Sequence, residues 1–264
     1  MFRRHCYVRY FMDEIDDGWI LFLDADMGIV NPDHLIEDYL PRNKNVEVVM
    51  YDRFYNFEIM AGSYLAKNSD YSRRFLTHWS DFFYRLPNAF HGTDNGAIHI
   101  VVMEFAFPHL KKERKKCERI YNASKNYNTL FDYQACTRMY IDGKSDPLRW
   151  CRDSWLTANK WAPMDFILHS WNMRLLNQLY GGGFFFPLVR QLSQSEELKH
   201  PEARVDSKSI ADTCRTINPG GLWAYKDTFM ATNEEISFTL NARASMVRDD
   251  YDDTIDRLRK QGKL

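Results

Sequence analysis

Two carboxylates stand two residues apart at the end of an apolar run near the start of the chain. The run WILFL occupies residues 19–23, and Asp24-Ala25-Asp26 follows it directly. In a strand, Asp24 and Asp26 point to the same face because side chains alternate with a period of two. Neighbouring carboxylates repel each other unless a cation lies between them, and hard divalent ions prefer oxygen ligands. The pattern therefore predicts a Mg²⁺ or Mn²⁺ site at the carboxyl end of a strand, where open α/β sheets bind ligands.

The same motif has two other interpretations. Acidic residues after an apolar run often do no more than end a strand and begin a turn. The haloacid-dehalogenase type of phosphatase also carries Asp-x-Asp after an apolar strand, with the first Asp as its nucleophile. In that class a Thr or Val usually follows two residues after the second Asp, and here Gly28 occupies this position.

The elements that position the two carboxylates follow from the spacing of the apolar residues. Strands are predicted at residues 19–23, 46–51 and 58–66, the last one broken at Gly62. Helices are predicted at 2–15, at 32–40 with Asn31 as its cap, at 69–85 and at 96–105. This order of helices and strands predicts an α/β fold in which helices flank a mixed sheet.

The second half of the chain is more polar. The run KKERKK at residues 111–116 indicates a solvated helix face rather than a binding patch. A short strand running into a loop is predicted at 167–171, and a charged helix is predicted at 249–260. We therefore expect an α/β domain over residues 1–190 and a polar C-terminal extension, residues 191–264, that packs on it.

Composition narrows the class of partner. The chain has 264 residues and a net charge of -1, which gives no electrostatic basis for binding nucleic acid. Its opening residues MFRRH precede no apolar stretch of a signal peptide, and no apolar run is long enough to cross a membrane. We expect no nucleic-acid partner and no membrane span in this chain.

The cysteines leave the redox state open. There are five of them, and no pair has the spacing of a metal knuckle. They form either one or two disulfides with a free thiol, or remain five reduced thiols. Asn122-Ala123-Ser124 is a glycosylation sequon, which matters only if the chain enters the secretory pathway.

Four segments occur in an informative order: WILFLDADMGIVNP, EIMAGSYLAKNSDYSRRFLTHW, FHGTDNGAIHIVV and FILHSWNMR. In this order they resemble glycosyltransferases of the GT-A fold, most closely glycosyltransferase family 34. They resemble more closely still a nematode-expanded family of unknown function described as nucleotide-diphospho-sugar-transferase-like. The resemblance covers roughly residues 1–180. The phosphatase class has no counterpart of the second or the fourth segment, which favours the transferase.

The resemblance implies a metal site. Asp24 would hold the donor ribose or the metal, and Asp26 would bind the metal and the diphosphate. His169 matches the late histidine that completes the metal shell. An imidazole ligand favours Mn²⁺, with Mg²⁺ as the alternative. Without the other segments, a structural histidine between strand and loop is the simpler interpretation of His169.

The resemblance also implies contacts to the donor. Arg174 lies where the family carries a Lys that neutralises the leaving diphosphate, although a planar fork then replaces a point charge. Gly62 and Ser63 lie in a stretch that would approach the donor sugar closely, and a plain strand bulge is the alternative. Arg4 lies roughly where related transferases place an Arg that contacts the donor.

Asp94 and Asn95 match the family's Asp-Gln pair. Asp94 would hold hydroxyl groups of the donor sugar, and Asn95 would lie under the anomeric carbon. Asn is one methylene shorter than Gln and reaches less far. A helix cap before Gly96 is the alternative interpretation of the two residues.

The function implied by the resemblance is the transfer of a sugar from a nucleotide-sugar donor, UDP-linked, to a hydroxyl of a glycan or glycoprotein acceptor. Retention of anomeric configuration and a location in the Golgi or secretory lumen are implied in the same way. GT-A enzymes usually have one or two βα units before the motif strand, whereas about one helix precedes it here. We therefore expect a GT-A-like sheet without its first βα units, an exposed edge or an open cleft beside the motif strand, and low activity or none. The alternative is a non-catalytic pseudoenzyme that binds glycan or protein.

Overall fold

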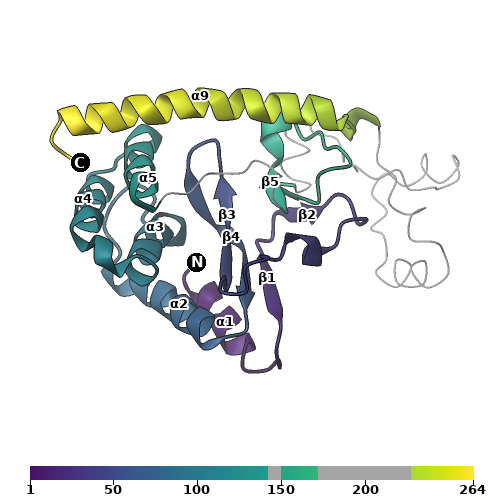
Figure 1. The fold of residues 1–264 in the computed structure, drawn as a ribbon, viewed down its shortest axis with the longest axis horizontal. Helices are drawn as coiled ribbons and strands as arrows, with labels where there is room; N and C mark the ends of the chain where they lie inside the picture. Colours follow the sequence, from purple (N-terminus) through teal and green to yellow (C-terminus); the bar gives the residue numbers. More distant parts are fainter. Residues whose placement is uncertain (142–149, 172–226) are drawn as a thin grey trace, which may run out of the picture. The chain divides into compact units, whose positions relative to one another are not determined.

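The computed structural model describes residues 1–141, 150–171 and 227–264 (Figure 1). The chain divides into two compact units, and each is described by itself. Unit 1 comprises Met1–Ala25, Ile36–Arg152 and Leu240–Leu264, and unit 2 comprises Asp26–Leu35 and Asp153–Thr239. The domain boundary expected at residue 190 lies outside the described residues. Helices and small sheets occur together, so the mixed α/β class is confirmed.

Unit 1 is built on a three-stranded sheet in the order β1-β4-β3. The strands are β1 (Trp19–Leu23), β3 (Val48–Arg53) and β4 (Glu58–Lys67), and β4 pairs antiparallel with both neighbours. A short turn joins β3 to β4, and such connections require antiparallel strands. The motif strand β1 lies at the edge of this sheet, as expected, and its residues are only half-buried, whereas β4 is buried along almost its whole length.

The ladder between β3 and β4 is interrupted in the middle. Met50 pairs with Tyr64, but the next residue, Tyr51, pairs with Met60. The residues of β4 between these two partners, 61–63, therefore bulge out of the ladder. The strand expected to break at Gly62 therefore continues through it, and the bulge given as the alternative for Gly62 is present.

Five helices of unit 1 lie on one side of the sheet, with α4 and α5 beyond α3 (Figure 1). They are α1 (Arg3–Phe11), α2 (Asp70–Asp81), α3 (Asp94–Phe105), α4 (Lys111–Asn122) and α5 (Tyr127–Ile141). The amphipathic pattern of α2 buries Phe75, Leu76 and Trp79 against the sheet. Ser69 caps this helix by accepting a hydrogen bond from the backbone N–H of Ser72 at 3.2 Å.

Several predicted helices have different bounds in the structure. The helix expected at 2–15 begins at Arg3 and ends at Phe11. The helix expected at 69–85 ends at Asp81 and continues as a 3₁₀ helix, Phe82–Arg85. The helix expected at 32–40 is only a 3₁₀ turn, Ile36–Tyr39, although the Asn31 side chain accepts the N–H of Asp33 at 3.1 Å, as a cap would. The charged C-terminal helix, α9 (Asn233–Lys260), begins earlier than expected.

Unit 2 contains a second sheet, in the order β2-β6-β5. β2 (Met27–Ile29) pairs antiparallel with β6 (Ile167–His169), and β5 (Cys151–Asp153) contributes Asp153 to this unit. The described residues thus form two three-stranded sheets instead of the single mixed sheet expected. Among the described residues of unit 2, Val30, Trp161, Leu168 and Phe229 form a buried apolar cluster.

The cysteines of unit 1 resolve part of the ambiguity left by the sequence. A disulfide joins Cys117 in α4 to Cys136 in α5, and both residues are fully buried. Cys6 carries an exposed thiol, Cys151 is buried, and Cys214 lies outside the described residues. None of the helices within 1–141, 150–171 and 227–264 has the length and apolar composition needed to cross a membrane.

A buried histidine of α3 ties the bulged strand to α5. The Nε2 atom of His99 accepts a hydrogen bond from the Ile59 N–H at 3.0 Å, so the Nδ1 atom carries the proton that faces Thr137 Oγ1 at 2.9 Å. Burial lowers the pKa of His99 from 6.5 to about 3. A second proton would have to bind Nε2, and this N–H group would then face the Ile59 N–H, which is also a donor.

We therefore predict that acid destabilises the fold through His99. Below pH 6.5 the His99 side chain is protonated in the unfolded chain but stays neutral in the folded chain. The folded state therefore loses stability as the pH falls from 6.5 toward 3. At pH 5 the loss from this one group is about 2 kcal/mol. Urea denaturation at pH 7 and pH 5 should show a smaller pH effect in His99→Gln. His109→Gln, at an exposed site, should keep the wild-type dependence. An unchanged dependence in His99→Gln would refute the assignment.

Candidate functional site

The two motif carboxylates do not share a strand face, and that expectation is wrong. β1 ends at Leu23, Ala25 and Asp26 form a turn, and β2 begins at Met27. The Asp24 carboxylate accepts the Ala25 N–H at 3.2 Å, and this local bond favours a turn over a continued strand. Asp24 consequently belongs to unit 1 and Asp26 to unit 2.

In unit 2 the ladder between β2 and β6 brings Asp26 and His169 together. Met27 pairs with His169, and the N–H of Trp171 donates to the Asp26 carbonyl at 2.9 Å. His169 Nε2 lies 3.4 Å from Asp26 Oδ1, and the Asp26 side chain is 35% exposed. His169 thus faces a motif carboxylate from a buried position.

A second carboxylate stands behind the histidine. Asp153 is 2% exposed and its Oδ1 lies 2.8 Å from His169 Nδ1. An ionised carboxylate only accepts hydrogen bonds, so Nδ1 carries a proton and Nε2 faces Asp26.

Sequence reasoning missed Asp153. Its position in a short strand after residues 142–149 carries no motif, and the chain has 36 acidic residues from which to choose. The one usable signal is chemical, because a metal-ligating histidine commonly donates its other N–H to a carboxylate. That rule says that such a partner exists without saying which acid it is.

In unit 1 the other motif carboxylate belongs to a charged network around Arg4. Arg4 Nη1 donates to Asp24 Oδ2 at 2.9 Å, and Arg4 Nε donates to Asp94 Oδ2 at 2.8 Å. The same Asp94 oxygen lies 3.1 Å from His5 Nε2, and His5 Nδ1 lies 3.3 Å from the Tyr64 hydroxyl. Helix α1 supplies the cation and the histidine, and the first residue of α3 supplies the buried acid.

Burial sets the protonation of this network. It lowers the pKa of His5 to about 4, despite the opposing effect of Asp94, so His5 is neutral at pH 7. Burial alone would raise the pKa of Asp94, but the hydrogen bond from His5 and the charge of Arg4 outweigh it and lower that pKa. Asp94 is therefore ionised and its charge is balanced by Arg4. Sequence analysis did not single out His5.

The two residues expected to act on the sugar are engaged within the protein. Asp94 is completely buried, and its second oxygen accepts the Asn95 N–H at 3.1 Å. The Asn95 Oδ1 atom accepts the Ala61 N–H at 2.7 Å, which satisfies a backbone group exposed by the bulge in β4. In this arrangement Asp94 holds Arg4 and Asn95 holds the bulge. Thr93, rather than Asp94 or Asn95, is the N-cap of α3.

Gly62 and Ser63 lie inside the bulge and are also packed. A Cβ atom on Gly62 would lie 2.5 Å from Met60 Sδ and 3.2 Å from Asp24 Oδ2, so the Met60 side chain would have to move to admit a larger residue. The Gly62 carbonyl accepts the Asp24 N–H at 2.7 Å, and the buried Ser63 Oγ accepts from Trp150 Nε1 at 2.9 Å. The bulge therefore positions Asp24 through its backbone. Arg174 lies outside the described residues.

The described residues show a pair of possible metal ligands and no larger set. No group of three or more His, Cys, Asp or Glu side chains suited to a metal occurs within 1–141, 150–171 and 227–264. A family model with the description "Protein of unknown function, DUF273" matches residues 1–183. No curated protein and no solved structure matches the chain.

Proposed function

We propose that this chain, which belongs to the DUF273 family of proteins of unknown function, is a metal-dependent glycosyltransferase of the GT-A fold. It would transfer a sugar from a UDP-sugar donor to a hydroxyl of a glycan or glycoprotein. The order of the four sequence segments supports the reaction class, and the mixed α/β architecture is compatible with the fold. Retention of anomeric configuration rests on the resemblance alone.

The observation that carries the proposal is the arrangement of three side chains in unit 2, in which His169 lies between Asp153 and Asp26. Neighbouring ligands of an octahedral ion with bonds of about 2.1 Å stand about 3 Å apart. The 3.4 Å between His169 Nε2 and Asp26 Oδ1 fits such a pair. Ions of this class commonly keep several waters and use one or two protein ligands together with substrate phosphates. The mixed nitrogen and oxygen donors favour Mn²⁺, with Mg²⁺ as the alternative.

These three residues have separate roles in the proposal. Asp26 and His169 would hold the cation, and Asp153 keeps the imidazole in the tautomer and orientation that present Nε2. When bound, the cation would draw negative charge from the leaving nucleoside diphosphate. The participation of Asp24 as a further ligand, and of Arg174 as a clamp on the diphosphate, stays a prediction from the resemblance.

In unit 1 we assign a positioning role to Asp94. Its carboxylate fixes the Nε edge of Arg4, which leaves the Nη1 edge to bind the half-exposed Asp24. Arg4 would thereby fix the position of the Asp24 carboxylate through a charge-assisted hydrogen bond. This departs from the direct contact between Asp94 and the sugar that the resemblance implies.

The proposed location is the Golgi or another part of the secretory lumen. The buried disulfide between Cys117 and Cys136 supports it, because disulfides persist in oxidising compartments and are rare in the cytosol. The family resemblance points to the same compartment.

A second candidate function is a pseudoenzyme that binds glycan or protein without catalysis. The observation in its favour is that Asp94 and the Asn95 carbonyl are hydrogen-bonded to the chain itself. The two candidates differ in turnover, since both are compatible with a bound nucleotide.

The test is calorimetric titration of the full chain with UDP, with and without Mn²⁺. We predict that UDP binds only with the cation and that Asp26→Asn abolishes this binding. Loss of an outer-shell partner of a metal ligand typically weakens metal binding by roughly 10–100-fold, and loss of a ligand should weaken it at least as much. Asp33→Asn is the matched control, because Asp33 is an exposed carboxylate of the same unit.

Three outcomes separate the interpretations. Mn²⁺-dependent binding that survives Asp26→Asn would remove Asp26 from the site. Binding that is lost in both variants would indicate a general effect of surface charge. Binding without hydrolysis or transfer from any UDP-sugar tested would support the pseudoenzyme.

A further inference from the structure

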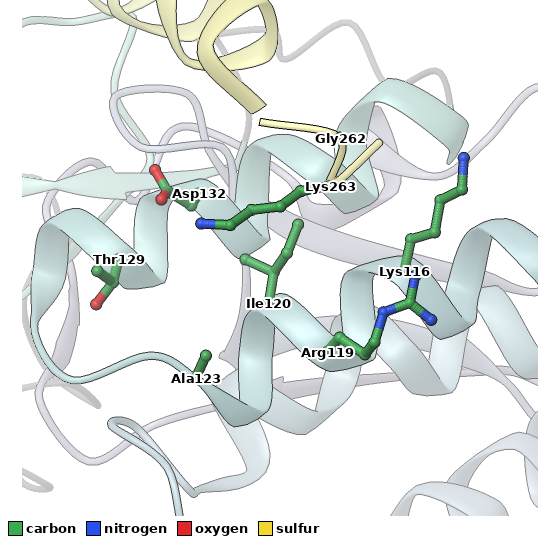
Figure 2. A pocket seen from close by; sticks show the side chains of 8 residues that line it. All are labelled: Lys116, Arg119, Ile120, Ala123, Thr129, Asp132, Gly262 and Lys263. Carbon is green, nitrogen blue, oxygen red and sulfur yellow. The ribbon is translucent and has the colours of Figure 1, made fainter. Parts of the chain in front are cut away.

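The glycosylation sequon Asn122-Ala123-Ser124 lies at the C-terminal end of α4. It is the only Asn-x-Ser/Thr triplet in the 264 residues. Asn122 is the last residue of α4 and its side chain is exposed. Ala123, which follows it, lines a pocket of about 310 Å³ beside Lys116 and Arg119 (Figure 2). Because Asn122 is exposed, a substituent on its side chain would not displace core side chains.

The same helix carries an independent sign of the compartment. Cys117 precedes Asn122 by little more than one helical turn and is bonded to Cys136 of α5. Such a disulfide indicates an oxidising compartment, and the eukaryotic secretory pathway is where N-glycosylation also takes place. This indication comes from two sulfur atoms and does not depend on the proposed transferase activity.

From these observations we infer that Asn122 carries an N-linked glycan. In the transfer, Asn122 Nδ2 forms a bond to C1 of an oligosaccharide donated by a lipid-linked diphosphate oligosaccharide. The bond between C1 and the diphosphate oxygen breaks, the lipid diphosphate leaves with the electron pair, and the amide loses one proton. The transferase of the secretory pathway that carries out this step supplies the donor.

The surroundings of Ser124 fix when the glycan is added. Ser124 is 3% exposed, its Oγ donates to the Phe90 carbonyl at 3.3 Å, and its N–H donates to the Tyr121 carbonyl at 2.9 Å. Once α4 has packed, the hydroxyl that the transferase must recognise is inaccessible. Asn122 is therefore modified before this part of the chain folds, and the folded chain is no longer a substrate.

The experiment is secretion of the full 264-residue chain from insect cells behind a cleavable secretion signal. Treatment with peptide N-glycosidase should lower the mass of the secreted protein by one glycan and convert Asn122 to Asp. The tryptic peptide of residues 120–125 should carry that conversion, both here and in protein isolated from its natural source.

Three variants and an enzymatically deglycosylated wild type separate the modification from effects on folding. Asn122→Gln and Ser124→Ala should both lack the glycan, whereas Ser124→Thr should keep it. Enzymatically deglycosylated wild type and Asn122→Gln should melt at the same temperature, because Asn122 is exposed. A secreted, disulfide-bonded wild type without a removable glycan would overturn the inference, as would a glycan that persists in Asn122→Gln. Modification of chain that was folded beforehand would overturn the proposed order of events.

Discussion

Replacing Asp94 with Asn is expected to lower the free energy of unfolding by about 3–5 kcal/mol, the usual loss when one partner of a buried ion pair is removed. The substitution keeps the size of the side chain but removes the charge that balances Arg4 and accepts the hydrogen bond from His5. The Arg4 side chain is 20% exposed and cannot regain full hydration without moving α1. Urea denaturation at pH 7 measures the loss directly.

Asp24→Asn is the matched control for this prediction. It removes the other carboxylate bound to Arg4, but the Asp24 side chain is 34% exposed and water can replace it. The expected loss is within about 1 kcal/mol, as for most solvent-exposed ion pairs. Equal losses in the two variants would show that burial does not distinguish the two ends of the Arg4 bridge.

The second large effect is expected from the disulfide between α4 and α5. The bond closes a loop with a sequence separation of 19, for which the chain-entropy estimate is about 3 kcal/mol. The double variant Cys117→Ala/Cys136→Ala should lose about this much stability and should no longer respond to a reductant. Chemical denaturation with and without dithiothreitol measures both quantities.

Cys6→Ala provides the control, because Cys6 is an exposed thiol far from the bond in sequence. It should keep the wild-type stability and the wild-type response to reductant. If the wild-type chain shows no response to reductant, the disulfide is not present, and the argument for an oxidising compartment no longer holds.

Local patterns in the sequence predicted several elements of unit 1 well. The apolar run of β1, the irregularity at Gly62 in β4 and the amphipathic helix α2 depend on neighbouring residues, so they can be read from the sequence directly. The turn at Asp24 and Asp26 was the alternative interpretation of the motif, and it forms because a bond from the Asp24 side chain to the next backbone N–H competes with the alternation of a strand.

The sites depend on contacts between distant residues, and this limited the prediction. His169 and Asp26 were paired only through the order of four segments, since no local pattern joins them. The buried partners of the site residues, Asp153 and Trp150, have no signature of their own. Asn95 shows the same limit, because its partner is a backbone group exposed by a bulge in another element.

The role that we propose for Asp94 differs from the contact with the sugar that the resemblance implies, and the difference has a physical reason. A carboxylate at the start of a helix after His91-Gly92-Thr93 looks available for a ligand in the sequence. In the structure the Asp94 carboxylate is fully buried, and Arg4 and His5 from α1 form hydrogen bonds with it. Packing of α1 against α2 places these partners, and no spacing within the motif reports it.

The most direct measurement of the central claim is pulsed electron paramagnetic resonance of Mn²⁺ bound to the full chain with UDP. Imidazole nitrogen bound to the ion gives a characteristic modulation of the spin echo. The account predicts this nitrogen signal in the wild type, its loss in His169→Gln, and its retention in His34→Gln, a second histidine of the same unit. A wild-type spectrum without nitrogen coupling, or one whose coupling survives His169→Gln, would contradict the proposed metal site.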